Sequence, residues 1–277
     1  MNSFDRLGRR TYLAATGSAV VGLTAGCTDL VSDQQYDRVV LEPPENYDAL
    51  RDSRDRGELP HPIYGDELPD VSAPCTIRDE EIATGDFEGE RHSLYTFIFA
   101  RCHGACPALT SSLRHVQADS ADNDYADDVA LVHVTFDPEH DTPEVLEEYG
   151  HDHGVNYDLN NWYDLRPESE AAAQEYVMDE FGCFYMRNED FEADDGHGDG
   201  HENDHDDDGH DEHDDHDDEP PEPDELDDES EMEMAFQHES MIVLANADGY
   251  VERTYTGDGL PSYSDLIDDV RTVAEEW

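Results

Sequence analysis

Two long apolar runs dominate the hydrophobic pattern of the chain. Residues 93–100 (SLYTFIFA) and 129–136 (VALVHVTF) are almost continuously apolar, which predicts two buried strands. Between them, Leu109, Leu113 and Val116 recur at helical spacing, so a helix is expected directly after the first strand. The central part of the chain is therefore predicted to run strand, helix, strand.

The later segments continue this alternation. Thr142 is placed to cap a helix that begins at Pro143, and residues 168–182 are rich in helix formers and end on Gly182. Residues 240–255 predict two strands around an Asp-Gly turn, and an amphipathic helix closes the chain. This order predicts an α/β fold with helices on both faces of a mixed central sheet, and a thioredoxin-like topology is the candidate.

The strongly negative charge of the chain argues against negatively charged binding partners. The net charge is −58, from 73 acidic residues against 15 basic ones, and all of the basic residues are arginine. Such a chain has nothing to offset phosphate repulsion, which argues against a nucleic-acid binder and against electrostatic docking on an anionic membrane. Charge-driven disorder is the alternative, but periodic apolar segments lie between the acids. We therefore expect a salt-adapted, halophile protein.

The first residues resemble a targeting segment. Arg9 and Arg10 precede a short apolar run that ends at Cys27 in the sequence TAGC. This resembles a twin-arginine export signal with a lipobox over residues 1–27, although Thr24 stands where leucine is usual. The alternative is an uncleaved anchor. In both cases we expect an extracytoplasmic protein held to the cell membrane, through a lipid on Cys27 in the first case.

The rest of the chain divides into a tether and one domain. Residues 28–65 are polar and are predicted to be a tether with one short helix, and residues 66–277 are predicted to form the domain. Within it, residues 189–233 hold 26 acids and no arginine, and predict a disordered insertion. Six histidines in this insertion suggest weak binding of several divalent metal ions. The alternative is a flexible, salt-tolerant segment in which the histidines add little. They are His197, His201, His205, His210, His213 and His216.

Two cysteines carry the candidate chemistry. Cys102 and Cys106 lie between the first apolar strand and the following helix, and Pro107 comes directly after them. The start of a helix lowers the pKa of a thiol, and the thiolate is the form that attacks disulfides or binds soft metals such as Cu(I) and Zn(II). The pair is therefore a redox pair or part of a metal site. Two inert core thiols are disfavoured, because the loop is not an apolar face.

A soft metal needs a third donor. His238 precedes a strand of the final hairpin, and in a thioredoxin-like fold that strand end lies beside the cysteine loop. Taken alone, a single histidine is usually a surface or hydrogen-bonded residue. Together with Cys102 and Cys106, His238 is the predicted third metal ligand.

The motifs CHGACP, VHVTFDPEHDTPEVLEEYG and QHESMIVLANADGYV together resemble the Sco/SenC family. The resemblance spans residue 70 to the C-terminus, apart from the insertion, and implies a thioredoxin-like copper chaperone for cytochrome oxidase assembly, here a salt-adapted, archaeal-type lipoprotein. It implies that Cys102, Cys106 and His238 bind the copper, as Cu(I) or Cu(II). Asp137 and Asp141 match the acidic segment near the site, with a structural or electrostatic role. His103 stands in a loop interior where the family often carries an aspartate, and we do not expect it to be a ligand.

The resemblance leaves two main functions open. The first is a metallochaperone that delivers copper to the dicopper site of the copper-carrying subunit of a terminal oxidase. The second is a thiol–disulfide oxidoreductase, with Cys102 and Cys106 as the catalytic pair, that keeps the cysteines of that subunit reduced. His238 favours the first, because a dithiol exchanger does not need it. Metal sequestration by the histidine-rich insertion is a third possibility, and a peroxidase is disfavoured because Cys102 lacks a Thr-x-x-Cys context.

Two further thiols belong to the domain. Cys75 lies at its start and Cys183 follows the helix that ends at Gly182. In an oxidising compartment the two are candidates for a structural disulfide. Two separate buried cysteines are an equally good alternative, since the sequence does not give their distance.

Overall fold

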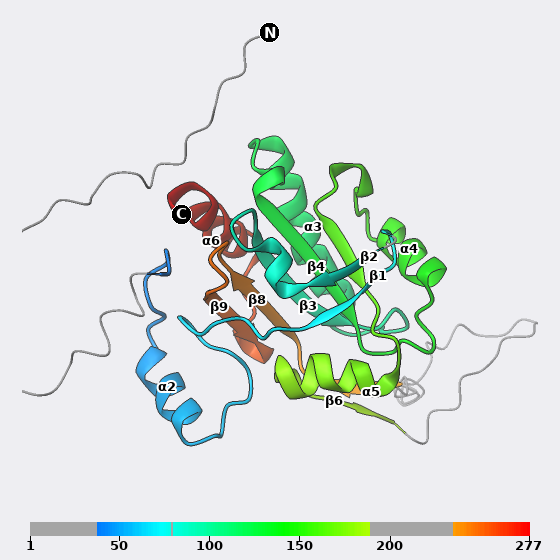
Figure 1. Ribbon diagram of the computed structural model, residues 1–277, viewed down its shortest axis with the longest axis horizontal. Coiled ribbons are helices and arrows are strands. Elements are labelled where there is room, and N and C mark those ends of the chain that lie inside the picture. Colours follow the sequence, from blue (N-terminus) through cyan, green and yellow to red (C-terminus); the bar gives the residue numbers. More distant parts are fainter. Residues whose placement is uncertain (1–37, 79, 189–234) are drawn as a thin grey trace, which may run out of the picture.

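A seven-stranded mixed sheet forms the centre of the molecule (Figure 1). The computed structural model describes residues 38–78, 80–188 and 235–277. From edge to edge the strands are β2 (Glu80–Ala83), β1 (Ser72–Cys75), β5 (Trp162–Leu165), β4 (Val129–Thr135), β3 (His92–Ile98), β8 (Met241–Ala245) and β9 (Val251–Thr256). The pairs β3–β4 and β4–β5 are parallel and the others are antiparallel, which confirms the predicted mixed sheet.

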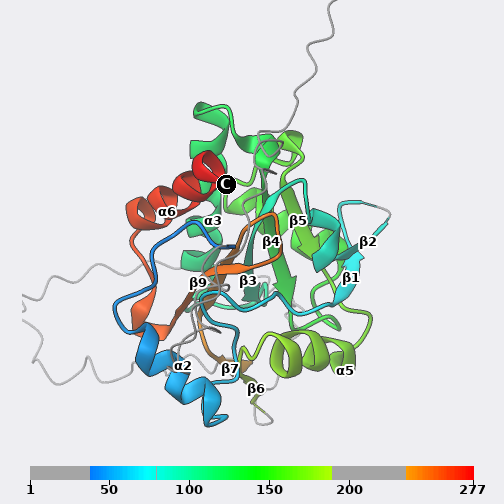
Figure 2. The same ribbon diagram turned by 60° about the vertical axis from the view of Figure 1, so that its left-hand side comes forward.

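Helices cover both faces of this sheet (Figures 1 and 2). Side chains alternate between faces along a strand, and His133 of β4 contacts Thr110 on the face covered by α3 (Cys106–Asp122), α4 (Pro143–Asp152) and α6 (Tyr263–Glu276). Tyr95 of β3 points to the other face, where its ring packs on Phe181. That face carries α5 (Glu170–Ala173) and the π-helical segment η4 (Gln174–Glu180).

The helix boundaries follow local rules. Thr142 accepts a hydrogen bond from the backbone N–H of Val145 at 3.3 Å, and Pro143 is the first residue of α4, as predicted. Gly182 has a φ of +68°, and a Cβ there would overlap the backbone of Pro60, so only glycine fits. The predicted helix over 168–182 instead begins at Glu170 and widens into η4, which places buried side chains against the sheet.

The described part of the predicted tether packs against the domain. Residues 38–65 contain the helix α2 (Tyr47–Asp55). The buried Tyr64 hydroxyl donates to the carbonyl of Leu41 at 2.6 Å, and the N–H groups of Val40 and Leu41 both donate to the buried carboxylate of Glu252 in β9. The sequence did not reveal this docking because its few apolar residues have no helix or strand period.

Several short elements were not predicted. They are the hairpin of β1 and β2, strand β5, and strand β7 (Phe236–His238), which pairs with the short strand β6 (Tyr185–Arg187) after Cys183 to form a two-stranded ribbon. The single-turn helices are η1 (Thr84–Phe87), η2 (Ala126–Asp128), η3 (Tyr157–Leu159) and η6 (Gly257–Gly259). Elements of three or four residues carry too little periodicity to be recognised.

Some predictions concern other parts of the chain. The export signal with Arg9, Arg10 and Cys27, and the histidine-rich insertion over 189–233, lie outside the described residues. Within the ranges 38–78, 80–188 and 235–277, no helix is long and apolar enough to cross a membrane.

Candidate metal centre

The two cysteines lie where a central strand passes into a helix. Strand β3 ends at Ile98, and α3 begins at Cys106 with Pro107 in its first turn. Both cysteines are buried, Cys106 completely. The loop between strand and helix therefore holds the two sulfur atoms at the helix start, where unpaired N–H groups and the helix dipole favour negative charge.

The histidine reaches these sulfurs from the ribbon of β6 and β7. Nε2 of His238 lies 3.4 Å from Sγ of Cys106 and 3.7 Å from Sγ of Cys102. The three donor atoms lie within 4.8 Å of one another. His238 precedes the hairpin strand β8, as expected, and it also ends β7, where it lies directly opposite Tyr185 of β6. The structure thus brings together the three residues that the sequence selected, and their role as metal ligands stays a prediction.

The orientation of the imidazole is fixed by its surroundings. Nδ1 of His238 faces the carbonyl of Glu239 at 3.1 Å, so this nitrogen carries the hydrogen and Nε2 is left to face the sulfurs. The ring packs edge-on against Phe99 and beside Phe136, with centroid distances of 5.7 and 5.3 Å. A ring held in this way presents its free nitrogen to a metal ion without further ordering.

The two thiols have opposite electrostatics. The pKa of Cys102 is lowered to about 4, chiefly by a hydrogen bond from the Cys106 thiol and further by the N–H groups of Cys106 and Gly104. The pKa of Cys106 is raised, first by burial and then by the adjacent negative sulfur. The reduced pair therefore holds one thiolate and one thiol at neutral pH.

The acidic segment scaffolds the cysteine loop. Asp137 and Asp141 are both fully buried. Asp137 accepts from Arg101, the residue before Cys102, at 2.6 Å, while Asp141 accepts from the N–H of Ala100 at 3.0 Å. Burial raises the pKa of Asp141 to about 6. Both carboxylates thus anchor the backbone that leads into Cys102, which is the structural role expected for them.

Arg101 and Arg187 were not identified from the sequence. Arg187 lies in β6, contacts both Asp137 and Glu170, and covers the ring of Phe236 at 4.7 Å. It therefore ties the histidine-bearing ribbon to the acidic segment. The only available signal was that Arg101 directly precedes Cys102 in a chain with few basic residues.

Other candidate groups do not form comparable sites among the described residues. His103 is exposed and does not belong to the donor group around the thiols. Asp137, His140 and Asp141 also lie within 4.8 Å of one another, but Asp137 is already paired with two arginines, which disfavours a cation there.

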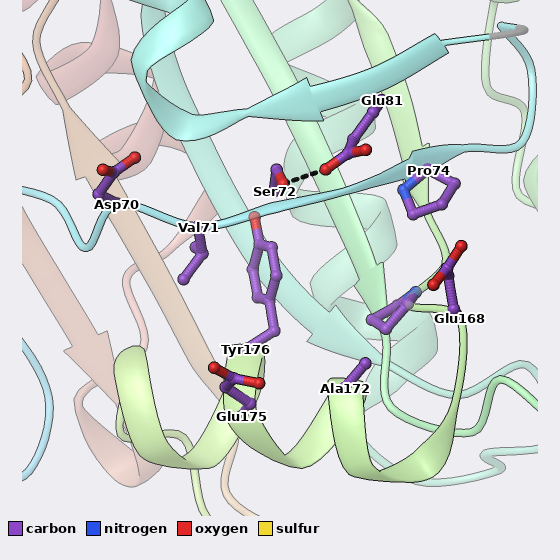
Figure 3. A pocket seen from close by; sticks show the side chains of 10 residues that line it. Asp70, Val71, Ser72, Pro74, Glu81, Glu168, Ala172, Glu175 and Tyr176 are labelled. Carbon is purple, nitrogen blue, oxygen red and sulfur yellow. Dashed lines mark hydrogen bonds between the residues drawn. The ribbon is translucent and has the colours of Figure 1, made fainter.

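A surface cavity of about 350 Å³ lies between β1 and the α5–η4 helix (Figure 3). Four carboxylates and Tyr176 line it, and the Ser72 hydroxyl donates to one of them, Glu81. Among the described residues, these carboxylates do not gather closely enough to hold one ion. The cavity is therefore not a second metal centre.

Cys75 and Cys183 are free and buried, which is the second of the two alternatives considered for them. Burial raises the pKa of each thiol. Sγ of Cys183 lies 3.5 Å from the carbonyl of Glu239, and Sγ of Cys75 lies 3.8 Å from the guanidinium of Arg78. Neither thiol faces a second sulfur.

Comparison with known proteins finds relatives of this chain. The family model described as SCO1/SenC matches residues 75–203. The chain is 23% identical over 204 residues to the SCO1 protein homolog of Bacillus subtilis, which covers 73% of this chain and 81% of that protein.

Two solved structures share the fold. A SCO1/SenC family lipoprotein from Bacillus anthracis aligns with a TM-score of 0.52 at 19% identity, over 76% of this chain and 95% of that one. Yeast Sco1 with copper bound aligns with a TM-score of 0.52 at 12% identity, over 76% and 91% of the two chains. These likenesses confirm the thioredoxin-like fold. The fold, the cysteine and histidine motifs and the matched family model all relate the chain to the SCO1/SenC family.

Proposed function

We propose that this protein is a copper metallochaperone that holds one copper ion with Cys102, Cys106 and His238. The observation that carries the proposal is the convergence of the three donors, with Nε2 of His238 3.4 and 3.7 Å from the two sulfurs. Two thiolates and one imidazole are a donor set that suits Cu(I), and the imidazole also tolerates Cu(II). Copper bound to the yeast relative supports the same cargo here.

Loading requires little rearrangement of the protein. Cys102 already favours the thiolate, so it is the first donor to meet the ion. Cys106 keeps its proton in the reduced protein and releases it to solvent when its sulfur binds the metal. His238 supplies the third donor without losing a proton, because its hydrogen faces the carbonyl of Glu239. A disulfide between Cys102 and Cys106 would remove both sulfur donors, so oxidation excludes the cargo.

The proposed recipient is the dicopper site of the copper-carrying subunit of a terminal cytochrome oxidase, as the family assignment suggests. Such a client lies at the extracytoplasmic face of a membrane. A lipid on Cys27 would hold the chaperone at that face. Replacing Cys27 with serine should release the protein from the membrane fraction, and a wild-type protein that keeps the residues before Cys27 contradicts the lipid anchor.

The direct test is a competition titration of reduced protein with Cu(I) and a chromophoric chelator. Wild type should bind one ion tightly, whereas Cys102→Ser and Cys106→Ser should each weaken binding by more than about 100-fold, since soft thiolates supply most of the affinity. His238→Ala should weaken it by about tenfold or more. Copper held elsewhere in the chain is measured with the double Cys102→Ser, Cys106→Ser variant. Wild-type affinity in both single cysteine variants would contradict the metal site.

The oxidoreductase alternative is favoured by a different observation, the thiolate character of Cys102. In that reaction the Cys102 thiolate attacks a client disulfide and forms a mixed disulfide, and one client sulfur leaves. Cys106 then loses its proton and attacks Cys102, so the client leaves as a dithiol and the chaperone is oxidised by two electrons. Fast reduction of a client disulfide that is unchanged in His238→Ala would favour this function.

The histidine-rich insertion suggests a third, auxiliary function, weak collection of divalent ions. Deleting residues 196–218 should lower the number of weakly bound ions and leave the tight copper site in place. Loss of the tight site in this deletion would instead place that site in the insertion.

A further inference from the structure

A buried polar network lies beneath the first turns of α3, and neither metal binding nor disulfide exchange accounts for it. Oγ1 of Thr110 lies 2.9 Å from the carbonyl of Cys106, 3.0 Å from Nε2 of His133 and 3.0 Å from the hydroxyl of Tyr149. All four residues are buried. Polar groups in such a place are costly unless each is hydrogen-bonded, so the network calls for a specific role.

The carbonyl of Cys106 can only accept, so Thr110 donates its one hydroxyl hydrogen to it. The oxygen of Thr110 is then left for its other two partners, the hydroxyl of Tyr149 and Nε2 of His133. The contact between Cys106 and Thr110 is thus the end of a polar chain that begins deeper in the sheet.

The far end of the chain is Asp164 in β5. Nδ1 of His133 lies 3.4 Å from Oδ1 of Asp164, and both side chains are almost completely buried. The indole N–H of Trp162 donates to Oδ1 at 2.9 Å, and the hydroxyl of Tyr157 donates to Oδ2 at 2.8 Å. Gly150 makes this possible, because a Cβ there would overlap the hydroxyl of Tyr157. The carboxylate is therefore fixed from two sides, and it fixes the imidazole in turn.

The sheet register explains why these side chains meet. His133 of β4 lies directly opposite Asp164 of β5, so both point to the α3 face. Thr110 is four residues after Cys106, one helical turn further along α3, and faces the same side of the helix. The network thus connects the rigid centre of the sheet to the residue that carries one of the two sulfurs.

We propose that Thr110, His133 and Asp164 are positioning residues that hold Cys106 in place for Cys102 and His238, an inference that rests on the proposed function. The hydroxyl of Thr110 holds the carbonyl of Cys106, which fixes the backbone at the first residue of α3. The sulfur of Cys106 then stays 3.4 Å from Nε2 of His238 before any ion arrives. Outer partners of this kind strengthen a metal site by removing the ordering that binding would otherwise require.

The test compares three variants of the full-length protein. Thr110→Val removes the hydroxyl and keeps the shape, Thr110→Ser keeps the hydroxyl, and Ser112→Ala is the matched control. Ser112 also donates to a carbonyl four residues back, that of Ala108 at 2.9 Å, but it is not hydrogen-bonded to His133. Two quantities are measured: the Cu(I) affinity by chelator competition, and the equilibrium of the Cys102–Cys106 disulfide with dithiothreitol.

We expect Thr110→Val to weaken Cu(I) binding about tenfold and Thr110→Ser and Ser112→Ala to stay within about twofold of wild type. The disulfide of Thr110→Val should be about tenfold harder to reduce, a shift of about 30 mV, because a displaced Cys106 donates less well to the Cys102 thiolate. Unfolding by denaturant confirms that each variant is folded under the assay conditions.

The proposal is overturned if Thr110→Val matches wild type in both measurements. It is also overturned if Ser112→Ala loses as much as Thr110→Val, or if Thr110→Ser does not restore the wild-type values. A wild type that binds no Cu(I) contradicts the proposed function, and the positioning role is then decided by the disulfide equilibrium alone.

Discussion

The protein contains two pairs of thiols that are equally buried and chemically opposite. Cys102 and Cys106 share a loop at a helix start, whereas Cys75 and Cys183 are separate thiols in the body of the domain. Hydrogen-bond donors converge on Cys102 and lower its pKa to about 4. Cys183 faces a carbonyl oxygen, and burial raises its pKa. Burial alone therefore does not make a thiol inert, because donated hydrogen bonds can outweigh it, as they do at Cys102.

The largest expected difference is in alkylation rate. At pH 7 Cys102 is almost entirely thiolate, whereas Cys75 and Cys183 keep their protons and are shielded. Iodoacetamide should therefore label Cys102 in the folded, reduced protein at least about 100-fold faster than either structural thiol. Peptide mapping by mass spectrometry after timed quenching measures this. Equal labelling of Cys75 or Cys183 would remove the distinction between the pairs.

The second prediction concerns the cause of the low pKa. The strongest contribution is the hydrogen bond from Cys106, so Cys106→Ala should raise the pKa of Cys102 by about two units or more. The pH midpoint of Cys102 alkylation reports this shift. Cys183→Ala is the control and should leave the midpoint unchanged. An unchanged midpoint in Cys106→Ala would assign the low pKa to the helix start alone.

The third prediction is a pH-dependent contribution to stability from Asp141, which anchors the backbone before Cys102. Burial raises the pKa of Asp141 to about 6 from 3.8, so the folded state is favoured while this carboxyl is protonated and loses that stability as the pH rises through 6. Asp141→Asn is neutral at every pH. The free energy of unfolding of the variant minus that of wild type should therefore increase by about 3 kcal/mol between pH 3.5 and 7.

Urea unfolding at several pH values measures this difference. The subtraction cancels the carboxylates that lie far from Asp141, because these titrate equally in both proteins. A difference that is flat with pH would show that Asp141 is ionised in the folded state without cost.

The smallest effects are expected for the structural thiols. Cys75→Ala and Cys183→Ala each leave a small space in the core and should lower the free energy of unfolding by about 1 to 2 kcal/mol. Neither should change the Cu(I) affinity by more than about twofold, although Cys183 lies beside the carbonyl that orients His238. A larger loss of affinity in Cys183→Ala would make that thiol part of the site.

The elements that could be predicted are those with a long, uniform pattern. The runs over 93–100 and 129–136 became β3 and β4, because fully buried parallel strands are apolar on both faces. Strand β5 was not predicted from the sequence because its four residues, WYDL, include an aspartate that lies in the core. That aspartate is tolerated only because His133, Trp162 and Tyr157 surround it, and such a partnership cannot be read along one segment.

The site shows the same division. Cys102 and Cys106 were found because both lie in one short motif, and His238 was found because it precedes a hairpin strand whose end a thioredoxin-like fold places beside the cysteine loop. Arg101 and Arg187 were missed because their partner, Asp137, lies 36 and 50 residues away in sequence. Long-range ion pairs of this kind depend on the fold and leave no local spacing to recognise.

The ribbon of β6 and β7, which carries His238, determines how freely the length of the connection between its two strands can change. The N–H of Asn188, directly after β6, donates to the carbonyl of Ala235, directly before β7, at 2.9 Å. The residues that flank 189–234 are therefore hydrogen-bonded to each other. Bringing the two ends of a loop together costs conformational entropy, and each doubling of the loop length adds only about 0.6 kcal/mol to that cost. The pairing of β6 with β7 sets the position of His238. Sequence can therefore be added or removed between the strands with little effect on the placement of the histidine.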